Sequence, residues 1–114
     1  MILVVGSQAS GKRDYVRSLG YKDSDVADGV LDERPVLYNL QNLIAKDPAT
    51  SAALLPQLLK KQVVVCNEVG SGVIPTVRGE RDAREAIGRL CVQLARKAER
   101  VVRLVAGIET IIKG

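Results

Sequence analysis

The stretch that decides the fold runs from Ile2 to Lys12 and reads ILVVGSQASGK. Its first four residues are Ile, Leu and Val, a composition typical of a buried strand. The next seven have glycine at positions 6 and 11 and lysine at position 12, which is the GxxxxGK spacing of a phosphate-binding loop. Helical spacing follows up to Leu19 and ends at Gly20, a natural C-cap. Strand, glycine-rich turn and helix in this order are the setting that such a loop requires.

The chemistry of this loop is anion binding. Glycines let backbone N–H groups converge on phosphate oxygens, the helix dipole favours negative charge, and Lys12 reaches toward the terminal phosphates. We therefore predict a phosphate-bearing ligand at this loop. A glycine-rich turn with a surface lysine is the alternative that stays open. The predicted contact residues are Gly6, Ser7, Gln8, Ala9, Ser10, Gly11, Lys12 and Arg13.

Arg13 occupies the position where such loops carry Ser or Thr, whose hydroxyl holds Mg²⁺. A guanidinium can pair with phosphate but cannot ligate a cation. Ser10 offers a hydroxyl, but from a different position in the loop. The sequence therefore predicts anion affinity and names no metal ligand.

Outward from this loop, apolar runs alternate with helical patterns. A continuous apolar run at Val63–Cys66 predicts a central strand covered on both faces, and Ser51 is the predicted N-cap of a helix that contains Pro56. The other expected elements are a loop over 21–34, a strand at 36–40 passing into a short helix that ends at 47–48, a loop marked by Gly70, Ser71, Gly72 and Pro75, a long helix over 83–98, and strands at 101–105 and 110–112 separated by Gly107.

This alternation predicts an α/β fold with a mostly parallel sheet and flanking helices, the three-layer sandwich of P-loop nucleoside triphosphatases. The ligand site should lie at the carboxyl ends of the strands. The length of 114 residues and the composition, 46% hydrophobic and 26% charged, indicate one globular domain over residues 1–114. The first residues lack a basic region and no apolar run reaches about 20 residues, so we expect a cytoplasmic protein without a membrane contact.

Charge and residue usage exclude several functions. The formal charge of +4 mildly favours phosphate-bearing partners, but the chain has only three aromatic residues, all tyrosines, which argues against nucleic-acid binding. Cys66 and Cys91 lack CxxC spacing and are expected to be small core residues in a reducing compartment. The absence of histidine excludes histidine-based acid/base chemistry, metal ligation and phosphohistidine intermediates from these 114 residues.

Asn67-Glu68-Val69-Gly70-Ser71-Gly72-Val73-Ile74-Pro75 follows the predicted central strand. This motif resembles the adenosylcobinamide kinase / adenosylcobinamide-phosphate guanylyltransferase family of cobalamin biosynthesis. The resemblance continues through Arg78, Arg81, Arg84, Gly88-Arg89 and the last predicted strands, and the opening strand and loop match as well. It implies binding of a purine nucleotide, ATP or GTP, and assembly as a homo-oligomer. It also implies kinase activity with adenosylcobinamide as acceptor, in which Lys12 is a predicted catalytic residue that stabilises the charge on the phosphate.

The chain also departs from the family pattern in its length and at specific positions. Family members are longer, and the missing length lies between the first helix and the Cys66 strand, where they carry the guanylylated histidine. Asn39 stands where the family's second strand ends in a metal-binding carboxylate. The expectation is therefore a kinase-like protein without guanylyl transfer through histidine, or a non-catalytic nucleotide-binding or interaction module.

Other charged residues leave two interpretations each. Glu68 is the second predicted catalytic residue, as a metal ligand or proton acceptor, or it holds its loop through backbone N–H groups. Arg81 and Arg84 contact phosphates or a neighbouring subunit, or lie on a solvated face. The acidic stretch from Asp23 to Glu33 has no metal-ligand spacing, and we interpret it as a solvated loop.

Overall fold

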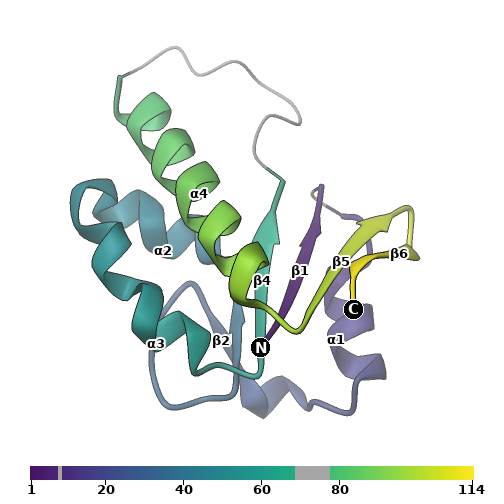
Figure 1. The fold of residues 1–114 in the computed structure, drawn as a ribbon. Helices are drawn as coiled ribbons and strands as arrows, with labels where there is room; N and C mark the ends of the chain where they lie inside the picture. Colours follow the sequence, from purple (N-terminus) through teal and green to yellow (C-terminus); the bar gives the residue numbers. More distant parts are fainter. Residues whose placement is uncertain (8, 69–77) are drawn as a thin grey trace.

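The computed structural model describes residues 1–7, 9–68 and 78–114 of the chain. Six strands form one sheet in the order β2-β3-β4-β1-β5-β6 (Figure 1). All neighbouring pairs are parallel except β5 and β6, which pair antiparallel. The predicted α/β fold with a mostly parallel sheet is therefore confirmed. The strands are β1 (Ile2–Gly6), β2 (Val26–Asp28), β3 (Val36–Tyr38), β4 (Val63–Asn67), β5 (Arg100–Val105) and β6 (Ile108–Lys113).

Strand β1 lies at the centre of the sheet, between β4 and β5. Val4 is level with Val65 on one side and with Val102 on the other. The four residues Val63–Cys66 are fully buried, because helices cover both faces of β4. The sequence prediction of a central strand at this position is confirmed.

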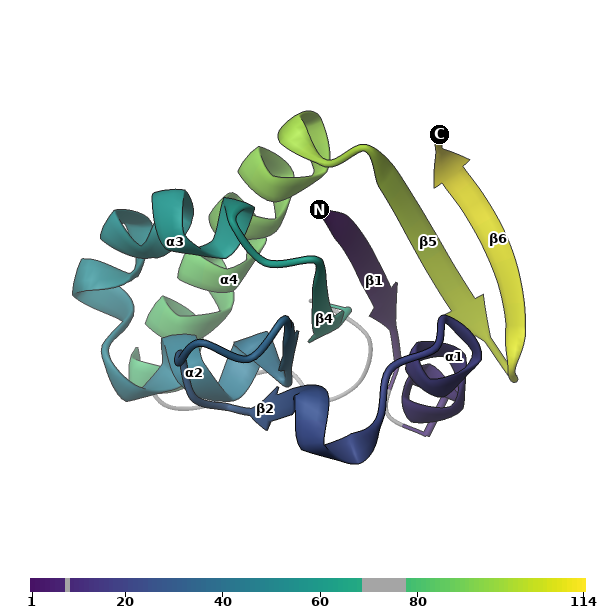
Figure 2. The same cartoon turned by 90° about the horizontal axis from the view of Figure 1, so that it is seen from below.

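The helices form two layers (Figure 2). Helix α1 (Lys12–Ser18) covers one face, where Val16 packs with Val4 and Leu104. The other face carries α2 (Leu40–Lys46), a 3₁₀ helix (Pro48–Leu54), α3 (Leu55–Leu59) and α4 (Arg78–Lys97). Their core includes fully buried leucines, each of which contributes about 1.5 to 3 kcal/mol to the hydrophobic free energy of folding. The result is the expected three-layer sandwich.

One local prediction was incomplete and another was wrong. The stretch 21–34 is mostly loop, as predicted, but it also contains a 3₁₀ helix at Asp23–Asp25 and the edge strand β2. β2 has only three residues, too few to show a period, yet Val26 and Ala27 are buried against the sheet. Ser51 is no N-cap: it lies inside the 3₁₀ helix and donates a hydrogen bond to the Pro48 carbonyl. Pro56 is in the first turn of α3, the position where proline fits a helix.

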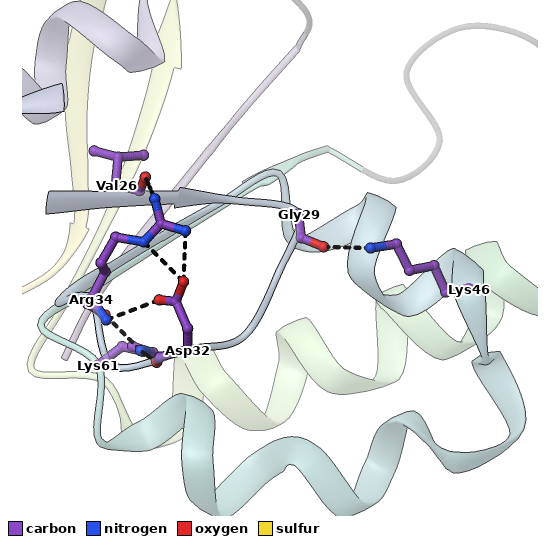
Figure 3. A network of polar contacts seen from close by, with 6 residues as sticks. All are labelled: Val26, Gly29, Asp32, Arg34, Lys46 and Lys61. Carbon is purple, nitrogen blue, oxygen red and sulfur yellow. Dashed lines mark hydrogen bonds and ion pairs between the residues drawn. The ribbon is translucent and has the colours of Figure 1, made fainter. Parts of the chain in front are cut away.

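A polar clamp formed by Asp32, Arg34 and Lys61 holds the connection between β2 and β3 (Figure 3). Arg34 donates to the Asp32 carboxylate at 2.9 and 2.6 Å and to the carbonyl of Val26 at 3.0 Å. The Lys61 ammonium donates to the carbonyls of Asp32 and Arg34. These hydrogen bonds from Arg34 lower the pKa of Asp32 below its usual value. The clamp fixes the short strand whose last residue, Asp28, reaches the site described below.

The two cysteines lie where β4 meets α4. Cys66 is buried, Cys91 is half-buried, and both are free thiols. The neighbouring Cys91 thiol and burial raise the pKa of the Cys66 thiol well above its usual range. Within the described part of the chain, no helix is long and apolar enough to cross a bilayer.

Candidate functional site

The predicted phosphate loop connects the carboxyl end of β1 to the first turn of α1. Gly11 is the N-cap of α1 and has φ of 90°, a left-handed conformation that favours glycine. A Cβ at Gly11 would lie 3.1 Å from Cα of Gly107, and one at Gly6 would lie 2.9 Å from the carbonyl oxygen of Leu104. Both positions therefore require glycine, because the loop backbone packs closely against β5 at Gly6 and against the β5–β6 turn at Gly11.

Lys12 is buried beneath the loop, with a relative exposure of 4%. Its ammonium Nζ donates to the carbonyl of Ser7 at 2.5 Å and lies 3.4 Å from the carbonyl of Gly6 and 3.5 Å from Oγ of Ser10. Burial lowers the pKa of Lys12 below 10.5, and the charge of Glu68 opposes that shift. Loop carbonyls therefore hold a desolvated cation at the point where the motif predicts phosphate.

A pocket of about 210 Å³ opens above the loop, lined in part by Ser10, Lys12, Arg13 and Tyr38. The Arg13 guanidinium stacks on the Tyr38 ring, 4.4 Å from its centroid. The same guanidinium lies 3.7 Å from the carboxylate of Asp28 at the end of β2. Lys12, which is buried, and Arg13, which is half-buried, therefore both line a single pocket, an arrangement suited to an anion.

A chain of side-chain hydrogen bonds crosses the carboxyl ends of β2, β3 and β4. The amide of Asn39 donates to Asp28 at 2.7 Å, and the amide of Gln41 donates to Asn39 at 3.0 Å. Gln41 in turn accepts the backbone N–H of Asn67 at 3.0 Å. Asn39 itself has φ of 57° as the N-cap of α2. The strand ends that flank the loop are thus joined by polar contacts.

Glu68 follows β4 and reaches over the end of β1. Its backbone N–H donates to the carbonyl of Gly6 at 2.9 Å. Its carboxylate accepts from Nε of Arg103 on β5 at 2.5 Å and from Nη2 at 3.3 Å. The predicted second catalytic residue therefore sits at the same sheet edge as the phosphate loop, in an ion pair with a neighbouring strand.

Comparison with known proteins identifies the family. The family model for cobinamide kinase / cobinamide phosphate guanyltransferase matches residues 36–112, more than half of the chain. The chain belongs to this family. It is also 37% identical over 94 residues to the bifunctional adenosylcobalamin biosynthesis protein CobU of Escherichia coli (strain K12). That alignment covers 82% of this chain and 48% of the relative, so the chain spans about half the relative's length.

Membership of the cobinamide kinase / cobinamide phosphate guanyltransferase family confirms the resemblance found in the sequence, and the fold is that of a P-loop nucleoside triphosphatase. The family match begins at β3 and extends into β6, so it includes Asn39 and Glu68. The phosphate loop precedes the matched segment. Its assignment rests on its spacing and on the geometry given above.

The structure brings together most of the predicted site residues that it describes. Ala9, Ser10, Gly11, Lys12 and Arg13 line the pocket, and Gly6 and Ser7 lie beneath it through their contacts with Lys12. Gln8 and the loop marked by Gly70, Ser71, Gly72 and Pro75 fall outside the described residues. Arg81 is exposed and Arg84 half-buried on α4, and neither lines this pocket.

Sequence reasoning missed four residues of the site: Asp28, Tyr38, Gln41 and Arg103. The sequence prediction for the acidic stretch that contains Asp28 was a solvated loop. The signal that could have identified it is the pair Val26-Ala27 before it, a short apolar step ending in a carboxylate. Tyr38 could have been identified as the last residue of a predicted strand, because parallel strands place their carboxyl ends along one edge.

The described donor set at this edge departs from that of a usual Mg²⁺ site at a phosphate loop. Mg²⁺ in phosphate sites needs a hydroxyl or carboxylate with open lone pairs and near-octahedral geometry. Asp28 is bound by Asn39 and faces Arg13, Glu68 is paired with Arg103, and Arg13 replaces the expected hydroxyl. Among the residues that the structure describes, no three Asp, Glu, Cys or His side chains are grouped to hold a metal ion.

Proposed function

We propose that the protein binds the phosphates of ATP or GTP in the loop at residues 6–13, as a nucleotide-binding member of its family that acts in cobalamin biosynthesis. The observation that carries this proposal is the buried Lys12 ammonium, held by loop carbonyls beneath a pocket that Arg13 also lines. A buried cation is costly unless carbonyl or anionic oxygens surround it. Phosphate oxygens at the loop would supply this partner from the open side.

A second pocket next to the phosphate pocket is the proposed binding position of the nucleoside. This pocket of about 330 Å³ shares Gly11 and Asp14 with the first and extends between α1 and the β5–β6 hairpin. Tyr15 and Glu109 line it, and burial together with the neighbouring Glu109 carboxylate raises the pKa of Tyr15. We place the purine here because an aromatic ring offers a stacking surface of the kind that bases use.

If the protein is an active kinase, the terminal phosphate of ATP or GTP passes to the hydroxyl of the aminopropanol arm of adenosylcobinamide. The bond to the β-phosphate breaks, ADP or GDP leaves, and the hydroxyl proton passes to the Glu68 carboxylate. Lys12 then stabilises the charge on the transferred group, and Glu68 serves as the catalytic carboxylate near it. Membership of the cobinamide kinase family supports both the kinase activity and adenosylcobinamide as the acceptor. An assay for transfer of labelled γ-phosphate to adenosylcobinamide tests it directly.

The second candidate function is a nucleotide-binding module without catalysis. The observation in its favour is that both described carboxylates at the strand ends face arginines, Asp28 facing Arg13 and Glu68 facing Arg103. Binding of nucleotide without phosphate transfer to adenosylcobinamide distinguishes this function from the kinase.

Guanylyl transfer through histidine is not proposed, because the 114 residues contain none. Incubation with GTP labelled at the α-phosphate should leave no acid-labile label on the purified protein. Label that survives gel filtration and is lost in acid would contradict this proposal and point to a lysine nucleophile.

Assembly as a homo-oligomer and a cytoplasmic location complete the proposal. The strand β6 is exposed along its whole length and presents Ile108, Ile111 and Ile112. Long exposed apolar edges are commonly covered in assemblies. Light scattering on the purified protein measures the mass.

The experiment that tests nucleotide binding is a calorimetric titration of ATP and of GTP into the wild-type protein and into Lys12→Ala. We expect binding by the wild type and loss of binding in the variant. Lys22→Ala is the control, because Lys22 is an exposed lysine outside the pocket. No heat of binding with either nucleotide at millimolar concentration would contradict the proposed function.

A further inference from the structure

The residue after the loop lysine is the unusual feature of this site. In phosphate loops of the GxxxxGK[ST] type, the residue after the lysine supplies a hydroxyl to Mg²⁺, and the ion bridges two phosphates. Here that residue is Arg13, which presents five N–H donors and no lone pair to a metal. The Arg13 guanidinium thus supplies a positive charge at the position where a Ser or Thr hydroxyl would bind Mg²⁺.

The Arg13 side chain is held at the mouth of the pocket from two sides. Its guanidinium lies 4.4 Å from the centroid of the Tyr38 ring and 3.7 Å from the Asp28 carboxylate. Asp28 is fixed in turn by the amide of Asn39 at 2.7 Å. Tyr38 and Asp28 are aligned neighbours at the ends of β3 and β2. Backbone pairing therefore sets the position of both groups that hold the arginine.

The contact with Asp28 is loose enough for a ligand to replace it. The side chains of Arg13 and Asp28 are 35% and 53% exposed, and 3.7 Å is long for a charge-assisted hydrogen bond. Such an exposed pair is stabilised only weakly. A phosphate in the pocket offers the guanidinium two oxygens in a geometry that it matches as a fork.

We propose that the Arg13 guanidinium, positioned by Tyr38 and Asp28, takes the place of the divalent cation on the bound phosphates, so that the site binds metal-free nucleotide. This inference rests on the proposed nucleotide binding and specifies the ligand as the free polyphosphate rather than its Mg²⁺ complex. Among the described residues, the two carboxylates at the strand ends beside the loop face arginines, Asp28 facing Arg13 and Glu68 facing Arg103.

The test is a calorimetric titration of ATP and of GTP, each with excess MgCl₂ and with excess EDTA, into the wild type, Arg13→Ser and Arg13→Lys. In the wild type, EDTA leaves the dissociation constant unchanged within about threefold or lowers it. In EDTA, Arg13→Ser binds about tenfold or more weakly than the wild type, since a charged contact to phosphate is lost. Arg13→Lys keeps the positive charge but lacks the two parallel N–H donors of the guanidinium, so its affinity in EDTA should lie between those of the wild type and Arg13→Ser.

Arg17→Ser is the matched control. Arg17 lies one turn along the same helix, pairs with Asp14 and Asp23, and does not line the pocket. This variant should keep the wild-type affinity in both buffers. Thermal unfolding of each variant measures whether it is folded.

The outcomes separate this inference from the proposed function. Wild-type affinity that weakens more than about threefold in EDTA overturns the inference and leaves nucleotide binding intact. Equal affinity of Arg13→Ser and wild type in EDTA overturns it as well. Failure of the wild type to bind either nucleotide in either buffer overturns the proposed function itself.

Discussion

The backbone N–H of Gly107 donates a hydrogen bond to the carbonyl of Ser10 at 2.9 Å. This bond joins the β5–β6 turn to the phosphate loop, across 97 positions of the chain. Gly11 packs against the same turn, where its missing Cβ leaves room for Cα of Gly107. The last hairpin of the chain therefore supports the shape of a loop near its start.

Gly11→Ala should lower both stability and nucleotide affinity. The substitution places a Cβ at φ of 90° and 3.1 Å from Gly107, at a cost of about 1 to 3 kcal/mol. Gly20→Ala is the control, because Gly20 has φ of 100° but no atom within 4 Å of an added Cβ. Denaturation and ATP titration of both variants check the prediction. Equal loss of affinity in the two variants would contradict a role for the contact between Gly11 and Gly107.

Tyr15→Ala should weaken the binding of ATP and GTP while leaving the binding of tripolyphosphate unchanged. The loss should be about 1 to 3 kcal/mol, the contribution of stacking by one base. Tyr15→Phe retains the ring and should bind nearly as the wild type does. Calorimetry with the three ligands separates the nucleoside from the phosphates. A parallel loss for tripolyphosphate would place the defect in the loop instead of the base pocket.

The affinity for nucleotide should fall at alkaline pH. Burial lowers the pKa of Lys12 below 10.5 in the free protein, and bound phosphate favours its charged form. Binding is therefore present while Lys12 is protonated and is lost as the pH rises through the lowered pKa. Lys12→Arg stays charged, because arginine does not lose its proton below about pH 12. Its affinity should be flat from neutral pH to about pH 10, and a decline matching the wild type would assign the titration to another group.

The long apolar segments were predictable from the sequence because each carries its own signal. Val63–Cys66 is a continuous apolar run, and the apolar stripe on α4 recurs at helical spacing from Ala83 to Leu94. Strand β2 was not predicted, because its three residues are too few to show a period and its local signal is no more than the pair Val26-Ala27 before Asp28. Pairing with β3 and the hydrogen bond from Arg34 to the Val26 carbonyl stabilise it, and such contacts are not visible in the local sequence.

The candidate site likewise has one part that the sequence predicted and another part that it did not. The spacing of Gly6, Gly11 and Lys12 identified the loop, because the requirements of the loop are local. The contact of Arg13 with Asp28 and Tyr38 depends on the register of β2 and β3, which the sequence does not specify. The pairing of Glu68 with Arg103 depends equally on the order of β4, β1 and β5 in the sheet.

The central claim is that nucleotide phosphates bind at this loop, and the most direct measurement is a titration of ¹⁵N-labelled protein with ATP and GTP by nuclear magnetic resonance. The account predicts the largest amide shifts at Gly11, Lys12 and Arg13, with a further shift at Gly107 through its bond to Ser10. Lys12→Ala should abolish these shifts. Largest shifts in the groove of about 800 Å³ between α2 and α4, lined in part by Lys46 and Arg89, would contradict the account.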